Sequence, residues 1–279
     1  MKKYKLLILM LCCSLMGICG KYLFDYLQAS LANRQAYEEI TDIGFPEDET
    51  DEETENTETE SESGAKEEQD NFDYASLLAI NSDCIGWIRI EGTGIDYPVV
   101  QAVDNFYYLH HNFNQETASC GSIFLDCRND IDLPQEHLIL YGHQMKDGSM
   151  FKELNGYKDQ EFFKEHPKII LYLRDKKYIY DVAAVYVTNI ANSGGYYNFL
   201  HTKTRKEQIE YLQNQMAAYQ LYDTGLTVTE KDELLSLSTC EYSSANGRLI
   251  VLAKRREKSE RQDYEQSSDS EQFNGRSNP

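Results

Sequence analysis

Basic residues are scarce in this chain of 279 residues. It contains 27 lysines and arginines against 47 aspartates and glutamates, for a net charge of −20 at neutral pH. Nucleic-acid phosphates are bound mainly by clustered lysine and arginine side chains. The shortage argues against a nucleic-acid-binding protein, so we expect no nucleic acid among the partners.

Closely spaced cysteine pairs are missing as well. The sequence has seven cysteines but no C-x-x-C pair, the spacing that marks many zinc sites. Three of the seven lie in an apolar N-terminal stretch, and Cys84, Cys120 and Cys127 are expected to be reduced and buried. Neither a zinc site nor a disulfide framework is supported. Cys240 differs because it ends a predicted strand among polar residues.

One long apolar run lies near the N-terminus. Residues 6–20 (LLILMLCCSLMGICG) carry no charge and are flanked by lysines. The run is shorter than the roughly 20 residues that cross a bilayer, but apolar residues follow it and lysine side chains extend to the interface. We interpret residues 1–26 as a cytoplasmic tip and an uncleaved membrane anchor. The lysines before the run place the N-terminus in the cytoplasm and the rest of the chain outside the cell.

Two alternatives to the anchor remain open. A cleaved signal peptide requires small residues before its cleavage site, and residues 28–30 provide only a poor one. A lipoprotein signal would use Cys19, but the bulky Ile18 stands where that signal requires a small residue.

An acidic segment follows the apolar stretch. Residues 47–70 hold 13 acidic residues and one lysine, a local charge of −12, and no aromatic residue. Such a composition cannot bury a core, and its like charges extend the chain. We interpret residues 27–70 as an extracellular stalk, first helical and then acidic; a tail that binds cations or basic partners is the alternative. Residues 257–279 read as a disordered polar tail.

Residues 71–256 have a globular composition, and their length suffices for one domain with a substantial core. Helical spacing predicts helices over residues 74–80, 149–154, 160–166 and 204–219. Short apolar runs predict strands over residues 87–90, 97–101, 121–125, 138–142, 168–173 and 178–188. Many short strands with a few helices indicate a mainly-β barrel.

Residues 234–254 (LLSLSTCEYSSANGRLIVLAK) predict a hairpin around which the site is organised. The first half alternates apolar and small polar residues, which is typical of a half-buried strand. Asn246-Gly247 is a favoured tight-turn pair before a second apolar strand. This hairpin brings Cys240 beside Arg248, and a permanent cation beside a thiol favours the nucleophilic thiolate.

A cysteine nucleophile usually needs a base or an imidazolium partner. Among six histidines, His143 is the best placed, because it follows an apolar strand and a glycine and leads into a polar loop. The other five lie in polar surroundings without special context. A plain loop histidine stays the alternative for His143, since 97 residues separate it from Cys240 and only the fold can join them.

Several segments, in this order, resemble those of the class B sortases, the membrane-anchored cysteine transpeptidases of Gram-positive bacteria. They are IGWIRIEGTGIDYPVVQ, GSIFLD, YGHQM followed by GSMF, and LSTC with Arg248 eight residues later. The resemblance covers roughly residues 74–254. It implies an eight-stranded sortase-type β-barrel with peripheral helices, including an N-terminal helix and one before the cysteine-bearing strand.

The resemblance also implies the chemistry and its residues. His143, Cys240 and Arg248 match the catalytic residues of the family. The implied substrates are secreted surface proteins bearing a C-terminal sorting motif, cleaved after threonine and transferred through a thioester to an amine of a peptidoglycan precursor or cross-bridge. Family positions that line the motif-binding groove correspond to Asn105, Leu109, Thr188, Tyr197, Ser238 and Glu241. Nothing resembles the paired acidic calcium site of class A members, so we expect no metal and no cofactor.

Two other functions remain open at this point, and a third lacks support. A pilin-polymerising sortase would use the same chemistry with a lysine of another protein as the nucleophile. A catalytically silent, membrane-tethered binding module would keep Cys240 as a simple buried residue. A papain-like hydrolase lacks support, because its local signature around the cysteine is absent.

Overall fold

The computed structural model of this chain describes residues 2–46, 71–132, 137–189, 197, 204–242 and 246–256. Its strands are β1 (Cys84–Arg89), β2 (Asp96–Val100), β3 (Ile123–Leu125), β4 (His137–Tyr141), β5 (Lys168–Leu173), β6 (Lys176–Asn189), β7 (Leu234–Glu241) and β8 (Gly247–Arg255). Its helices are α1 (Lys2–Gly44), α2 (Tyr74–Ile80), α3 (Gln160–Glu165) and α4 (Arg205–Tyr219), with 3₁₀ helices η1 (Tyr107–Leu109) and η2 (Phe151–Lys158).

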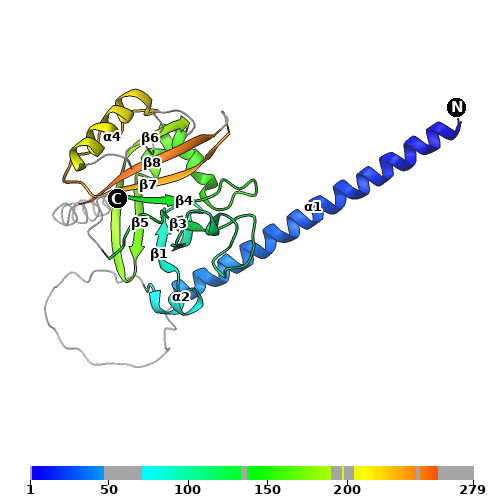
Figure 1. Cartoon of the computed structure of the whole chain (residues 1–279), viewed down its shortest axis with the longest axis horizontal. Coiled ribbons are helices and arrows are strands. Elements are labelled where there is room, and N and C mark those ends of the chain that lie inside the picture. The colour runs from blue at the N-terminus through cyan, green and yellow to red at the C-terminus, as the bar shows by residue number, and fades with distance from the viewer. Residues whose placement is uncertain are drawn as a thin grey trace, which may run out of the picture.

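The eight strands close into a barrel in the order β1-β2-β3-β4-β7-β8-β6-β5 (Figure 1). The pairs β2–β3 and β4–β7 are parallel, and the other neighbours are antiparallel. The prediction of an eight-stranded barrel with peripheral helices, one of them N-terminal, is confirmed. One predicted helix differs in type, because the segment after residue 150 winds as the 3₁₀ helix η2.

Strand alternation divides the apolar side chains of the barrel into two cores. Successive side chains of a strand point to opposite faces. In β7, Leu235 and Leu237 belong to the larger core inside the barrel, whereas Leu234 belongs to a smaller core on the outer face. Helix α4 covers this outer face with Ile209 and Leu212. The end of β7 that carries Cys240 lies beyond that cover.

Helix α1 is one continuous helix whose C-terminal part packs on the barrel. Tyr37 and Ile40 are buried in the larger core, and the Tyr37 hydroxyl donates to the carbonyl of Gly121 at 3.0 Å. Ser30 donates to Asp147 Oδ2 at 2.6 Å. The N-terminal part extends away from the barrel (Figure 1), and the side chains of residues 10–29 are exposed. Helix α1 is long and apolar enough to be a membrane anchor or a signal sequence.

The described residues that flank the acidic segment meet at the barrel. The backbone N–H of Asp73 donates to the carbonyl of Gly44 at 2.9 Å. A Cβ on Gly44 would lie 3.2 Å from Leu77 and from Trp87, so the helix end approaches both side chains closely. The interpretation of residues 27–70 as a stalk stays a prediction. Residues 47–70 themselves, and the predicted tail at 257–279, lie outside the described residues.

We predict that Ile40→Ala lowers the free energy of unfolding of the full chain by about 2–4 kcal/mol, because it removes a buried side chain at the joint between α1 and the barrel. The matched control is Glu39→Ala, which changes an exposed neighbour. Guanidinium unfolding in detergent micelles, followed by the fluorescence of the single tryptophan, Trp87, measures both. Equal midpoints for the two variants would show that α1 contributes nothing to the barrel.

Candidate active site

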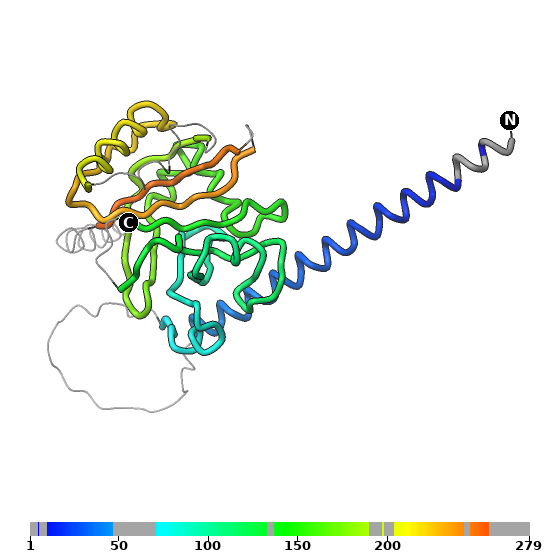
Figure 2. Tube along the Cα trace, viewed as in Figure 1, coloured from blue at the N-terminus to red at the C-terminus, as the bar shows by residue number. Residues whose placement is uncertain are grey.

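The register of the parallel pair β4–β7, extended past the strand end, puts the backbone of His143 level with that of Cys240. Tyr141 is the register partner of Ser238, and the pairing continues beyond the strand, because Gly142 N donates to the carbonyl of Ser238 at 3.2 Å. The hydroxyl of Thr239 donates to the carbonyl of Gly142 at 2.8 Å. Carrying this register one step further sets His143 level with Cys240. Figure 2 shows β7 and β8 running beside β4.

A cross-strand row places Arg248 beside the thiol. Cys240 on β7 is the direct partner of Arg248 on β8, and Arg248 is the direct partner of Thr188 on β6. Directly opposite residues have their Cβ atoms roughly 4.5–5.5 Å apart. Cys240 and Arg248 are both half-buried. The hairpin prediction is therefore confirmed, and three of the predicted site residues stand in one row.

The imidazole of His143 is held by a backbone carbonyl. Its Nε2 lies 2.8 Å from the carbonyl oxygen of Leu109. A carbonyl oxygen only accepts, so Nε2 carries the proton in this contact and Nδ1 is left for chemistry. The family resemblance singles out the side chain of Leu109, whereas in the structure its backbone orients the histidine. No local pattern in the sequence signals such a contact.

Ser238 shares the outer face with Cys240, two residues along β7. Its hydroxyl is hydrogen-bonded to the hydroxyl of Tyr197. Burial raises the pKa of Tyr197 to about 12, although the hydrogen bond to Ser238 and the charge of Arg248 oppose the shift. The phenol therefore stays neutral and available for hydrogen bonding. Two more predicted groove residues, Ser238 and Tyr197, thus lie near the thiol.

Glu241 does not join this cluster. By strand alternation its side chain points to the opposite face from that of Cys240. It is 7% exposed and pairs with Lys158 of η2, with Nζ 2.6 Å from Oε1. Adjacency in sequence to the cysteine suggested a groove position, but a strand turns neighbouring side chains apart. The geometry favours a structural ion pair for Glu241.

Asn105 is tied to a residue that the sequence did not single out. Its Nδ2 donates to Asp126 Oδ2 at 3.1 Å. The same carboxylate oxygen accepts from the hydroxyl of Tyr141 at 2.8 Å, and Arg128 forms a bidentate pair with the carboxylate. The sequence signal was only one aspartate directly after an apolar strand. Such a pattern also fits a solvated turn residue.

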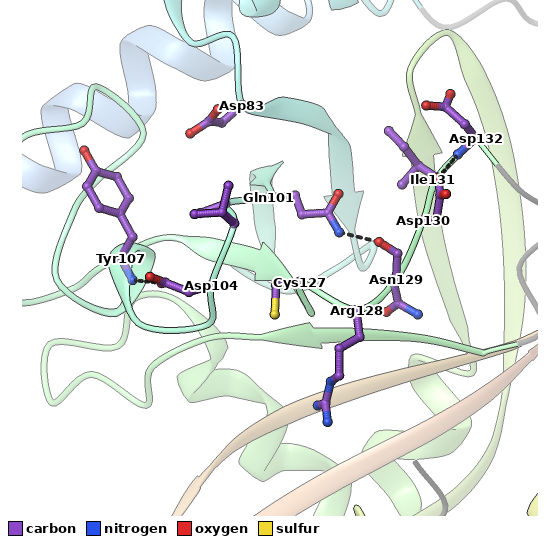
Figure 3. Close-up of a pocket in the computed structure, with 12 residues that line it drawn as sticks. Asp83, Gln101, Asp104, Tyr107, Cys127, Arg128, Asn129, Asp130, Ile131 and Asp132 are labelled. Atoms are coloured by element: carbon purple, nitrogen blue, oxygen red, sulfur yellow. Dashed lines mark hydrogen bonds between the residues drawn. The ribbon is translucent and has the colours of Figure 1, made fainter. Parts of the chain in front are cut away.

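A polar groove of about 710 Å³ lies beside this carboxylate but contains none of the predicted catalytic residues. Figure 3 shows Cys127, Arg128 and Asn129 on one side of it and Asp104 and Tyr107 on another. The Asp104 carboxylate accepts the backbone N–H of Tyr107 at 2.9 Å. Among the described residues, no group of three or more histidine, cysteine or acidic side chains is arranged to hold a metal ion.

A closed mixed barrel with a cysteine–arginine row and a histidine at one end of its outer face fits the barrel-type cysteine transpeptidase that the resemblance implies. Comparison with known proteins agrees. The Sortase domain model matches residues 88–256, more than half of the chain. Sortase B of Listeria monocytogenes is 38% identical over 180 residues, which is 64% of this chain and 72% of the relative.

Solved structures give the same result. The crystal structure of sortase B from B. anthracis in complex with AAEK1 is 34% identical, with a TM-score of 0.66, covering 83% of this chain and 100% of that one. The Staphylococcus aureus sortase B-substrate complex is 33% identical, with a TM-score of 0.59, covering 66% of this chain and 85% of that one. The chain belongs to the sortase family, with class B sortases as its relatives, and this family supports a transpeptidase function.

We predict that Cys240 is alkylated in the folded protein whereas the buried Cys84 and Cys120 are not. Burial raises the pKa values of Cys84 and Cys120 to about 11, and both side chains are at most 2% exposed. These two thiols should react with iodoacetamide at pH 7.5 only after unfolding, whereas Cys240, half-buried beside Arg248, should react at once. Peptide mass mapping of folded and guanidinium-unfolded samples reads each site separately. A folded-state Cys240 as inert as Cys84 would favour the silent binding module.

Proposed function

We propose that this chain is a cell-wall sortase. It cleaves a C-terminal sorting motif of secreted proteins after threonine and joins the new carboxyl group to an amine of peptidoglycan. One observation supports this most strongly: β4, β7 and β8 bring His143, Cys240 and Arg248 to the same end of the outer face. A solved structure with this fold, the Staphylococcus aureus sortase B-substrate complex, is 33% identical to this chain and supports substrate binding by such a barrel.

The first half-reaction forms a thioester. The Cys240 thiolate attacks the carbonyl carbon of the motif threonine and gives a tetrahedral intermediate. When this collapses, the peptide C–N bond breaks and the imidazolium of His143 gives its proton to the departing amine. The threonine is then held as an acyl group on the sulfur of Cys240, and the C-terminal fragment leaves.

The second half-reaction releases the enzyme. A neutral amine of a peptidoglycan precursor or cross-bridge attacks the thioester while neutral His143 accepts its proton. The carbon–sulfur bond breaks and an amide forms, which regenerates the Cys240 thiolate and the His143 imidazolium. Both half-reactions use the same two side chains in opposite protonation roles, and no metal or cofactor is required.

Arg248 acts on the oxygen of the reacting carbonyl and on the substrate backbone. Negative charge develops on that oxygen in each tetrahedral intermediate, and a charged donor fixed beside the sulfur stabilises it. The cross-strand pairing with Cys240 supports this role, because both side chains leave adjacent strands toward the same face. Arg248 also donates to the carbonyl of Gly247 at 2.9 Å, which restricts its conformations.

The proposal also assigns a role to the apolar helix α1. The apolar part of α1 anchors the chain in the cytoplasmic membrane as a single pass, with the barrel outside the cell, where both substrates occur. Lysines before the apolar run support this orientation. Because α1 continues without a break into the part buried against the barrel, the anchor and the catalytic domain form one structural unit.

The experiment uses the full chain in detergent micelles with a panel of peptides that carry different threonine-containing motifs, and with hydroxylamine as the acceptor amine. Intact mass should show an acyl adduct of one peptide on the protein and the hydroxamate product of the same peptide. Failure of every peptide to give adduct or product, with intact secondary structure, would overturn the proposal.

Three variants assign the roles in this assay. Cys240→Ala should give no adduct. His143→Ala should lose at least about a hundredfold in rate, the range expected for a general acid–base group. Arg248→Lys should also be strongly impaired, because an ammonium lacks the planar fork of a guanidinium. The matched control is Arg255→Lys, on the same strand and paired with Glu233 away from the site. Near-normal turnover in Arg248→Lys would exclude a role in which two N–H groups of the guanidinium bind the substrate together.

A further inference from the structure

The carboxylate of Asp126 is buried directly after β3 and is surrounded by donors. Its side chain is 1% exposed. Oδ1 accepts the backbone N–H of Arg128 at 2.9 Å and its Nε at 2.7 Å. Oδ2 accepts Nη2 of Arg128 at 2.5 Å, the hydroxyl of Tyr141 at 2.8 Å and Nδ2 of Asn105 at 3.1 Å. One carboxylate therefore joins three side chains from three separate segments.

The charge on Asp126 persists at neutral pH. Burial by itself raises the pKa of a carboxyl group, but the hydrogen bonds from Arg128 and Tyr141 together outweigh it, so the pKa of Asp126 lies below its usual range. Burial also raises the pKa of Tyr141 above its usual range, so its hydroxyl keeps its proton and donates. Asp126 therefore acts only as an acceptor, and each group hydrogen-bonded to its carboxylate is a donor.

This carboxylate determines which way the amide of Asn105 faces. An asparagine side chain has two N–H donors and one carbonyl oxygen. In Asn105 the oxygen accepts the backbone N–H of Cys127 at 2.8 Å, and one N–H donates to Asp126. If the amide were flipped, its oxygen would face the carboxylate of Asp126 and its NH₂ group would face the backbone N–H of Cys127. Both hydrogen bonds would be lost. The second N–H of Asn105 then has no hydrogen-bond partner among the described residues.

Tyr141 links the same carboxylate to the cysteine site. It lies two residues before His143 on β4 and is the register partner of Ser238. Its ring centroid is 6.0 Å from that of Tyr197, whose hydroxyl bonds to Ser238. A change at Asp126 therefore reaches two of the residues assigned to the groove, Asn105 directly and Tyr197 through the ring of Tyr141.

We propose that Asp126 is a positioning residue for substrate recognition, whose buried carboxylate holds Asn105 so that it presents an N–H donor to the bound peptide. The matching group on the peptide is a hydrogen-bond acceptor, a backbone or side-chain carbonyl. This inference rests on the proposed function and on the resemblance to class B sortases, which assigns Asn105 to the groove that binds the sorting motif. Asp126 itself touches neither the peptide nor the reacting atoms.

The first test is Asp126→Asn in the full chain, with the motif peptide that the wild type uses best. The variant keeps the shape but offers an amide where only an acceptor fits, so we expect KM for the peptide to rise about tenfold or more while kcat changes less than about twofold. The matched control is Asp130→Asn, which removes the same charge from an exposed carboxylate four residues on and should leave both constants unchanged. An unchanged KM in Asp126→Asn would overturn the proposal.

A double-mutant cycle with Asn105→Ala separates positioning from general structural support. If Asp126 acts through Asn105, its effect on KM shrinks once Asn105 is gone, so the two substitutions are strongly non-additive. Additive effects, or equal losses in KM and kcat together with a lower unfolding midpoint, would show that Asp126 only supports the fold.

NMR of the wild type tests the position of Asn105 without depending on activity or on the folding of Asp126→Asn. The side-chain amide signals of Asn105, assigned by their loss in Asn105→Ala, should show one proton shifted and protected from solvent exchange by the carboxylate. Rapid solvent exchange of both protons, with neither protected, would overturn the proposal. If no peptide is processed but this signature is present, the proposed function fails while the positioning of Asn105 stands.

Discussion

The parallel pairing of β4 with β7 is the interaction on which the site depends. Gly142 uses both backbone groups in it, donating to Ser238 and accepting from the hydroxyl of Thr239. This carries the register past the end of β4 and sets His143 level with Cys240. A shift by one residue would turn each outward side chain of β7 into the barrel, so the apolar core inside fixes the position of the thiol outside.

The pairing of β4 with β7 also requires a residue without a side chain at position 142. A Cβ at this position would lie 2.5 Å from Ile123 and 2.7 Å from Phe151. Both of these side chains are fully buried, and close-packed side chains have little room to yield. The backbone before the histidine therefore lies directly on the core, and the carbonyl of Leu109 then orients the ring. The packing of Gly142 on the core and the hydrogen bond from His143 to Leu109 together position the imidazole.

Two environments divide helix α1. Its first part is apolar and exposed, as a lipid-facing segment is, and its last part buries Tyr37 and Ile40 in the barrel core. The hydrogen bond between Ser30 and Asp147 reaches the loop that follows His143. In the proposed function the first part of α1 is the membrane anchor, and its continuity with the part packed on the barrel would restrict the orientation of the site relative to the membrane.

Local patterns in the sequence determined the strands, the hairpin and the candidate nucleophile. Alternation along residues 234–241 and the turn pair Asn246-Gly247 are short-range features, so they pair Cys240 with Arg248 without knowledge of the rest of the chain. The same patterns indicated a mainly-β barrel and singled out His143, and the resemblance to class B sortases added the number of strands and the role of the histidine. It also pointed to Asn105, Tyr197 and Ser238, without their partners.

Only the tertiary structure decided the remaining contacts, because each joins segments far apart in the sequence. His143 meets Cys240 through a parallel pair, which no turn specifies, and Asp126 gathers donors from two distant segments as well as from Arg128. Glu241 is adjacent to the cysteine yet points away from it to Lys158, since strand geometry separates neighbours. A sequence shows which side chains are present, but the closure of the barrel determines which of them meet.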